Sequence, residues 1–162
     1  ADAKAPASII FIDAPGGKLE TVDIDFRNGV ELEKAGALVG FHTDDGITDS
    51  RWFLRSAGLA VRAGMSRNGA LYAMTMANAK MLDLDTRVGS LEVGKDADLI
   101  VLSGDPLSVY THVMQTYVEG KKVFDRTDPK DYIFAVGGKG ATDDSDLTAH
   151  DISCFDGDGG NE

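Results

Sequence analysis

An acidic turn that follows an apolar run near residue 40 is the first place where this sequence could do chemistry. Residues 37–41 have the length and composition of a buried strand, and His42, Thr43, Asp44 and Asp45 follow them directly. In folds built from βα units, catalytic groups lie at the carboxyl ends of the strands, where the loops form the mouth of the active site. Asp44 is therefore a candidate catalytic residue, and Asp45 is a weaker candidate for contact with a substrate.

The same residues also fit a purely structural turn. A strand that ends in a turn rich in Asp and Gly is common, and Asp45 would then cap the turn together with Gly46. His42 lies two residues before Asp44, so on a strand both side chains point to the same face. A single His in such a place is more often a core group, or a support for other ligands, than a metal ligand. The residues alone leave both interpretations open.

The elements that would position this turn alternate between strand and helix. Residues 8–13 read as a buried strand closed by a Pro-Gly-Gly turn, and residues 28–36 as a short helix with a terminal Gly. With the strand at 37–41 they form a βα unit of a parallel sheet, and such strands are covered on both faces.

The middle of the chain is predicted to be helical and the part after Arg87 to be β. Residues 49–64 have helical apolar spacing with Gly64 as the stop, and Ser66 caps a helix over 67–82 that is broken and recapped at Thr75. Three β segments are expected after that, at 88–94, at 97–102 and as a hairpin over 113–124.

A second motif gives the turn at Asp44 a context. Gly94-Lys95-Asp96-Ala97-Asp98-Leu99 is a turn that leads into an apolar strand, and Glu119-Gly120-Lys121 lies in the hairpin that follows. With Thr43-Asp44 upstream, this combination resembles the C-terminal portion of the amidohydrolase superfamily, closest to the imidazolonepropionase-like metal-dependent hydrolases. The resemblance extends over roughly residues 8 to 126.

The resemblance implies an α/β fold, namely the C-terminal part of a (β/α)8 TIM-type barrel plus part of a small β domain. Residues 1–86 would be the last βα units of the barrel, residues 87–126 a segment of the small β domain, and residues 127–162 an acidic, flexible tail. The Gly94 motif would be structural, with Ala97 small for packing and Asp98 satisfying backbone donors ahead of the strand.

The resemblance also implies a chemistry. Asp44 would bind a divalent metal, zinc by expectation, and accept the proton of a metal-activated water that hydrolyses C–N bonds of cyclic amides, imides or peptides. The superfamily also uses a His-x-His pair and further His and Lys or Glu ligands, which this sequence lacks. We therefore expect metal only in a complete enzyme, formed with the N-terminal remainder of the barrel, and no activity from this chain alone. The alternative is a non-catalytic orphan fragment with a binding or structural role that self-associates.

Composition excludes several other classes. A net charge of −11 argues against nucleic acid as a partner, because binding to phosphates requires clustered Lys and Arg. No run of eighteen apolar residues is present, so we expect no membrane partner. Cys154 is the single cysteine, which excludes an intrachain disulfide. The sequence leaves two compartments open, the cytoplasm and the periplasm.

Overall fold

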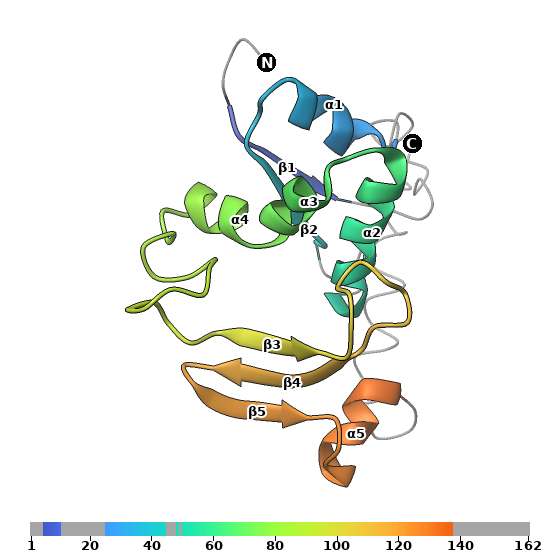
Figure 1. Ribbon diagram of the computed structural model, residues 1–162, viewed down its shortest axis with the longest axis vertical. Helices are drawn as coiled ribbons and strands as arrows, with labels where there is room; N and C mark the ends of the chain where they lie inside the picture. Colours follow the sequence, from blue (N-terminus) through green and yellow to red (C-terminus); the bar gives the residue numbers. More distant parts are fainter. Residues whose placement is uncertain (1–4, 11–24, 45–47, 49, 138–162) are drawn as a thin grey trace, which may run out of the picture.

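The protein is a mixed arrangement of helices and strands, as the sequence predicts. The computed structural model describes residues 5–10, 25–44, 48 and 50–137, and all structural statements below concern these residues. Figure 1 shows a three-stranded sheet at one end of the molecule and a two-stranded sheet toward the other. The elements are, in order, β1 (Ala7–Ile10), α1 (Asn28–Lys34), β2 (Val39–His42), η2 (Ser50–Trp52), α2 (Phe53–Ala63), α3 (Arg67–Met74), α4 (Met76–Met81), β3 (Leu99–Leu102), β4 (Val113–Val118), β5 (Lys121–Asp125) and α5 (Pro129–Val136).

The predicted βα unit is present. Strands β1 and β2 pair in parallel, with Ile9 opposite Phe41, and α1 lies between them in sequence. Val39 and Phe41 lie on one face of β2 and are 5% and 1% exposed. They pack against a face of α2 and α3 that consists of small residues, which allows these helices to approach the strand closely. The residues of this face are Ala57, Ala60, Ala70 and Ala73.

The helical region follows the sequence prediction at its caps. Gly64 ends α2 in the left-handed conformation with φ +115°, as expected of a C-terminal Gly. The chain breaks at Thr75, as predicted, and divides the helix into α3 and α4. The predicted recapping by Thr75 is wrong, because its hydroxyl donates to Leu71 O of the preceding helix instead.

Strands β3, β4 and β5 form an antiparallel sheet in that order. Glu119 and Gly120 connect β4 to β5 with φ values of +51° and +75°, the backbone that a tight hairpin turn requires. The β segment predicted at 88–94 is wrong, because those residues form turns. Gly89 adopts φ +91° and lies so close to α4 that a Cβ there would be 2.7 Å from Ala79 Cβ, so the chain bends where alternating residues suggested a strand.

Helix α5 lies beside β5, within the segment that was expected to be a flexible tail, and the Asp131 carboxylate on α5 joins the two by accepting from Asp125 N at 2.8 Å. Asp125 accepts hydrogen bonds from Lys122 Nζ (2.6 Å), Gln115 Nε2 (3.1 Å) and Thr127 N (3.0 Å), and its own amide donates to Asp131 on α5. Lys122 first, and Thr127 second, hold the pKa of the Asp125 carboxyl well below its ordinary value.

A second carboxylate joins α1 to α3. Ser66 caps α3 by accepting from Gly69 N at 2.9 Å, which confirms the prediction from the sequence. Glu33 on α1 accepts from both Ser66 N (2.8 Å) and Ser66 Oγ (2.5 Å). One acidic side chain therefore orders the cap of a neighbouring helix.

Among all these described helices, none combines the length and the apolar character needed to cross a membrane.

The cap at Ser66 predicts a measurable loss of stability. Ser66→Ala and Glu33→Gln should each lower the free energy of unfolding by about 1 kcal/mol, because Ser66→Ala removes the acceptor of Gly69 N and Glu33→Gln replaces one of the two charged acceptor oxygens on Ser66 by an NH2 group. Glu31→Gln is the control, since Glu31 lies on the same helix and pairs only with the exposed Lys34. Denaturant unfolding followed by circular dichroism measures the differences. Equal stability of Glu33→Gln and Glu31→Gln would contradict the role of Glu33.

The lowered pKa of Asp125 predicts a pH-dependent stability. The stabilisation should be complete above about pH 4, the ordinary pKa of an unfolded Asp, and should decline as the pH falls toward the lower folded pKa. Asp125→Asn should therefore reduce the melting temperature at pH 7 and reduce it less at pH 3. Asp83→Asn, an exposed position whose side chain has no hydrogen bond or ion pair in the described structure, is the control. A difference that stays constant from pH 7 to pH 3 would disprove the linkage.

Candidate functional site

Asp44 lies where the sequence analysis placed it, just beyond the carboxyl end of β2. Its side chain is exposed, and its backbone adopts the left-handed conformation with φ +51°. Asp tolerates this conformation better than most residues, but it is not free of cost. The loop that begins here closes on itself, because Thr48 N donates to Thr43 O at 3.1 Å. Asp44 therefore presents a carboxylate to solvent at the end of an ordered strand.

Three contacts fix the strand that carries Asp44. Pairing with β1 holds one edge, and burial of Phe41 holds one face. At the other edge, Asn78 on α4 donates from Nδ2 to Phe41 O at 2.8 Å. The sequence analysis did not identify Asn78. A signal for it was present in Gly40, because a Gly inside a strand often marks a close approach of other groups.

Of the other sequence-predicted residues, the structure describes only His42. His42 is exposed at the end of β2, whereas Val39, Gly40 and Phe41 are buried. The structure gives no contact between His42 and Asp44. Asp45 lies outside the described residues, so its predicted contact with a substrate stays a prediction.

The described residues do not by themselves fit a divalent metal ion. A tightly bound zinc ion needs three or four good ligands. Within the part of the chain that the structure describes, no three His, Cys, Asp or Glu side chains gather as such a site. Asp44 could supply one carboxylate ligand, and the others would have to come from outside these residues.

The Gly94 motif has the structural role that was expected of it. Lys95 is only 11% exposed at its side chain, and its ammonium group donates to Asp85 O (2.6 Å) and Ser90 Oγ (2.7 Å). It thereby closes the loop that returns from α4. The sequence analysis assigned no role to Lys95.

The two carboxylates of the same motif, Asp96 and Asp98, also bind groups in neighbouring turns. Asp96 pairs with Arg87 at 2.6 Å, and Asp98 accepts from Glu119 N at 2.7 Å. Asp98 does accept from a backbone donor, but the predicted location ahead of its own strand is wrong, because the donor belongs to the β4–β5 turn. Ala97 is exposed, so its small size does not reflect burial in a core.

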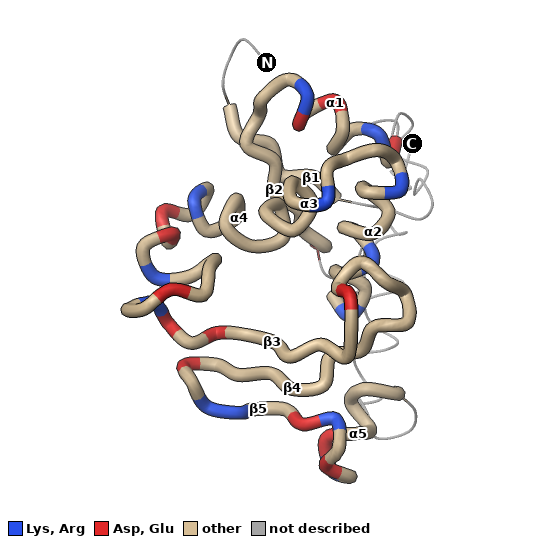
Figure 2. Tube along the Cα trace, viewed as in Figure 1, with Lys and Arg blue, Asp and Glu red and all other residues tan. Residues whose placement is uncertain are grey.

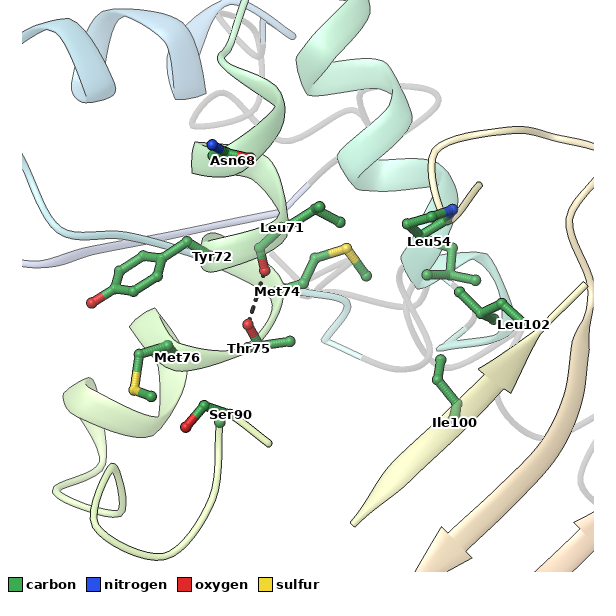
Figure 3. Close-up of a pocket in the computed structure, with 12 residues that line it drawn as sticks. Leu54, Asn68, Leu71, Tyr72, Met74, Thr75, Met76, Ser90, Ile100 and Leu102 are labelled. Atoms are coloured by element: carbon green, nitrogen blue, oxygen red, sulfur yellow. Dashed lines mark hydrogen bonds between the residues drawn. The ribbon is translucent and has the colours of Figure 1, made fainter. Parts of the chain in front are cut away.

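A groove of about 570 Å³ lies between the helices and β3, away from Asp44. Figure 3 shows Ile100 and Leu102 of β3 on one side of it, and Leu71 and Met74 of α3 opposite. No ionisable carboxylate, Lys, Arg or His lines the groove, and in Figure 2 the facing parts of α3 and β3 are mostly uncharged. Its lining is mostly apolar and offers no carboxylate, Lys, Arg or His, so Asp44 remains the catalytic candidate.

Comparison with known proteins gives this geometry a family. Residues 30–124, which include β2, Asp44, the Gly94 motif and the β4–β5 hairpin, match the model of the amidohydrolase family. The match covers more than half of the chain. The matched region includes both features on which the resemblance rested, the Thr43-Asp44 turn and the Gly94 motif with its hairpin.

Individual relatives agree with this match. The chain is 28% identical over 122 residues to amidohydrolase tasK of Hapsidospora irregularis, and 40% identical over 93 residues to adenine deaminase 2 of Shouchella clausii (strain KSM-K16). These regions cover 75% and 55% of this chain. The chain spans 12% and 16% of the length of these two relatives.

A solved structure shares the arrangement of the elements. The crystal structure of an amidohydrolase from Thermotoga maritima MSB8 superposes with a TM-score of 0.74 and 33% identity, over 78% of this chain and 33% of that one. The chain belongs to the amidohydrolase family.

Proposed function

We propose that this chain is the C-terminal portion of a metal-dependent hydrolase that cleaves C–N bonds of small molecules, with Asp44 as its catalytic carboxylate. The observation that carries the proposal is the position of Asp44, at the carboxyl end of a parallel strand inside the region that matches the family. Barrel enzymes place their reacting groups at this end of the strands.

The proposal gives the parts of the chain separate tasks. Residues 1–86 would complete the barrel, residues 87–126 would belong to the small β domain, and residues 127–162 would follow as an acidic tail. The packing supports a division near residue 87, since the apolar cluster around Phe41 draws on β1 to α3 and includes Leu107 as its one member from the later part of the described chain. Strands β1 and β2 form a two-stranded sheet, and further strands from the N-terminal remainder would extend it.

Asp44 would move a proton at its carboxylate oxygens. It would accept a proton from the attacking water as the water oxygen bonds to the carbonyl carbon, and would return that proton to the leaving nitrogen as the C–N bond breaks. Its exposed position leaves the carboxylate accessible to water and substrate. Cyclic amides, imides and peptides fit this reaction, and the adenine deaminase relative extends the candidates to nucleobases.

The metal belongs to the proposal for the complete enzyme. Zinc, with Asp44 as one ligand, would polarise the bond under attack and lower the pKa of the water. The remaining ligands would come from outside the described residues, in agreement with the small share of its relatives that the chain spans.

The proposed role of Asp44 predicts a large loss of turnover. In the intact native protein, Asp44→Asn should lower kcat by about 10²- to 10⁴-fold, because the amide cannot accept the proton. Asp83→Asn is a matched control, since Asp83 is also an exposed Asp in the left-handed conformation, with φ +57°. Product formation measures turnover, as the ring-opened acid from cyclic amides, the free amino acids from dipeptides and ammonia from adenine. Full activity of Asp44→Asn would disprove the assignment.

The proposal also predicts the metal content. Native mass spectrometry with elemental analysis should find about one or two zinc ions in the complex that contains this chain and the rest of the barrel. The 162-residue chain alone should retain none after dialysis. Chelation should abolish turnover, and added zinc should restore it. A metal-free species of only this chain's mass, isolated from the native source, would instead support the orphan fragment.

A further inference from the structure

Trp52 is an exposed aromatic residue at the end of the loop that begins with Asp44. It is the last residue of η2 and is 51% exposed, although a Trp side chain is on average mostly buried in a folded protein. The next residue, Phe53, packs against the apolar cluster around Phe41, so the start of α2 is fixed while half of the Trp52 surface stays in solvent. Packing within the described residues therefore does not explain why an indole ring stands at this place.

The loop returns the chain to the neighbourhood of Asp44 before Trp52 is reached. Thr48 N donates to Thr43 O at 3.1 Å, so Thr48 lies directly beside the residue that precedes Asp44. The segment from Thr48 to Trp52 is short and ends in the single turn of η2, which keeps the Cα atoms of these two residues within roughly 13 Å of one another. A substrate ring with its reacting atom at Asp44 spans much of this distance, and the Trp52 side chain spans the rest.

Arg55 holds the Trp52 ring from one side. Its guanidinium carbon lies 5.5 Å from the centre of the ring, which is the distance of a cation–π contact. Trp52 caps the start of α2 and Arg55 lies in its first turn, so the helix itself brings the two side chains together. Because one face of the ring lies against the guanidinium, the exposed surface of Trp52 belongs mainly to the other face and to the ring edge.

We propose that Trp52 is a specificity-determining residue, which stacks on the planar ring of the substrate while the reacting carbon lies at Asp44. The inference rests on the proposed function of Asp44 and narrows its substrates to planar nitrogen heterocycles such as adenine, in preference to open-chain dipeptides. An indole face binds a conjugated ring by offset stacking, whereas an open-chain dipeptide presents no such face. Further strands of the complete barrel would lie beside β2 and leave the loop that follows it at the mouth, so this position of Trp52 agrees with the barrel fold.

The fluorescence of Trp52 tests the contact without turnover. Trp52 is the single tryptophan of this chain, and the Trp52→Phe variant of the intact native protein gives the contribution of any other tryptophan in the complex. In an Asp44→Asn background, adenine should quench the Trp52 fluorescence in a saturable way, and alanylalanine should not. No saturable quenching by adenine would overturn the proposal.

Steady-state kinetics on the intact native protein measures the consequence for specificity. Trp52→Leu keeps an apolar side chain and removes the aromatic face, and it should raise KM for adenine about tenfold, as expected for the loss of stacking on one ring. The kcat for adenine and the KM for alanylalanine should stay near the wild-type values. Trp52→Phe retains a smaller aromatic face and should recover part of the affinity for adenine. Equal KM for adenine in the wild type and in Trp52→Leu would contradict the proposed role.

Tyr132 on α5 offers a matched control. It is 49% exposed and has the guanidinium of Arg126 5.9 Å from its ring centre, so its surroundings resemble those of Trp52. It lies beside β5, at the other end of the molecule from β2 (Figure 1). Tyr132→Leu should therefore leave KM for adenine unchanged. An equal rise of KM in both variants would overturn the proposal, because it would not depend on the position of the ring.

The outcomes separate this inference from the proposed function. Loss of turnover in Asp44→Asn together with an unchanged KM for adenine in Trp52→Leu would retain the proposed function and overturn the inference. Turnover confined to open-chain dipeptides would have the same meaning. Full turnover of Asp44→Asn would overturn the proposed function, and with it the placement of the substrate at Asp44, whatever the fluorescence of Trp52 shows.

Discussion

The burial of Phe41 is the constraint on which the arrangement around β2 depends. A large aromatic ring is 1% exposed in a cluster otherwise rich in alanine, so α2 and α3 must lie close to the strand to cover it. That approach fixes which face of β2 is buried. Because side chains alternate along a strand, Gly40 then faces the other side, where its missing side chain leaves room for α4. The end of the strand, and therefore Asp44, is set by these contacts rather than by any interaction of Asp44 itself.

The three-stranded sheet of β3, β4 and β5 is connected to the helices around β2 mainly by polar contacts. Among the described residues, Arg67 on α3 forms two hydrogen bonds with Asp105 after β3, and Lys95 closes the loop that connects α4 to β3. These are polar contacts at exposed or partly exposed positions, which contribute little individually. The apolar groove between α3 and β3 separates the two layers instead of joining them. Within the described residues, the sheet is thus joined to the helical unit by these polar links and by Leu107, which packs against the apolar cluster around Phe41.

The sequence predicted those features that a few neighbouring residues determine. Gly64, Ser66 and the Glu119-Gly120 turn act through their own backbone or through groups three residues away, so local rules found them. The prediction of a strand at 88–94 was wrong because the close contact of Gly89 with α4 determines the path of the backbone there. The alternation of apolar residues in the sequence does not indicate such a contact. The candidate site likewise combines a feature set by local sequence with a feature set by long-range packing. The position of Asp44 after a strand could be read from the sequence, whereas the hydrogen bond of Asn78 depends on how α4 packs.

The backbone of Asp44 gives one more reason to place chemistry at this turn. Three described residues other than Gly adopt a positive φ, and two have structural explanations. Glu119 belongs to a tight hairpin turn, and Asp83 directly follows the end of α4, where left-handed residues are common. Asp44 follows a strand, and no hairpin or helix end requires its conformation. Its left-handed backbone lies where the chain leaves β2, and Thr48 N donates to Thr43 O beside it. A backbone of this kind persists where the surroundings hold it, and the strand that leads into Asp44 is held by the burial of Phe41 and by the hydrogen bond from Asn78 to Phe41 O.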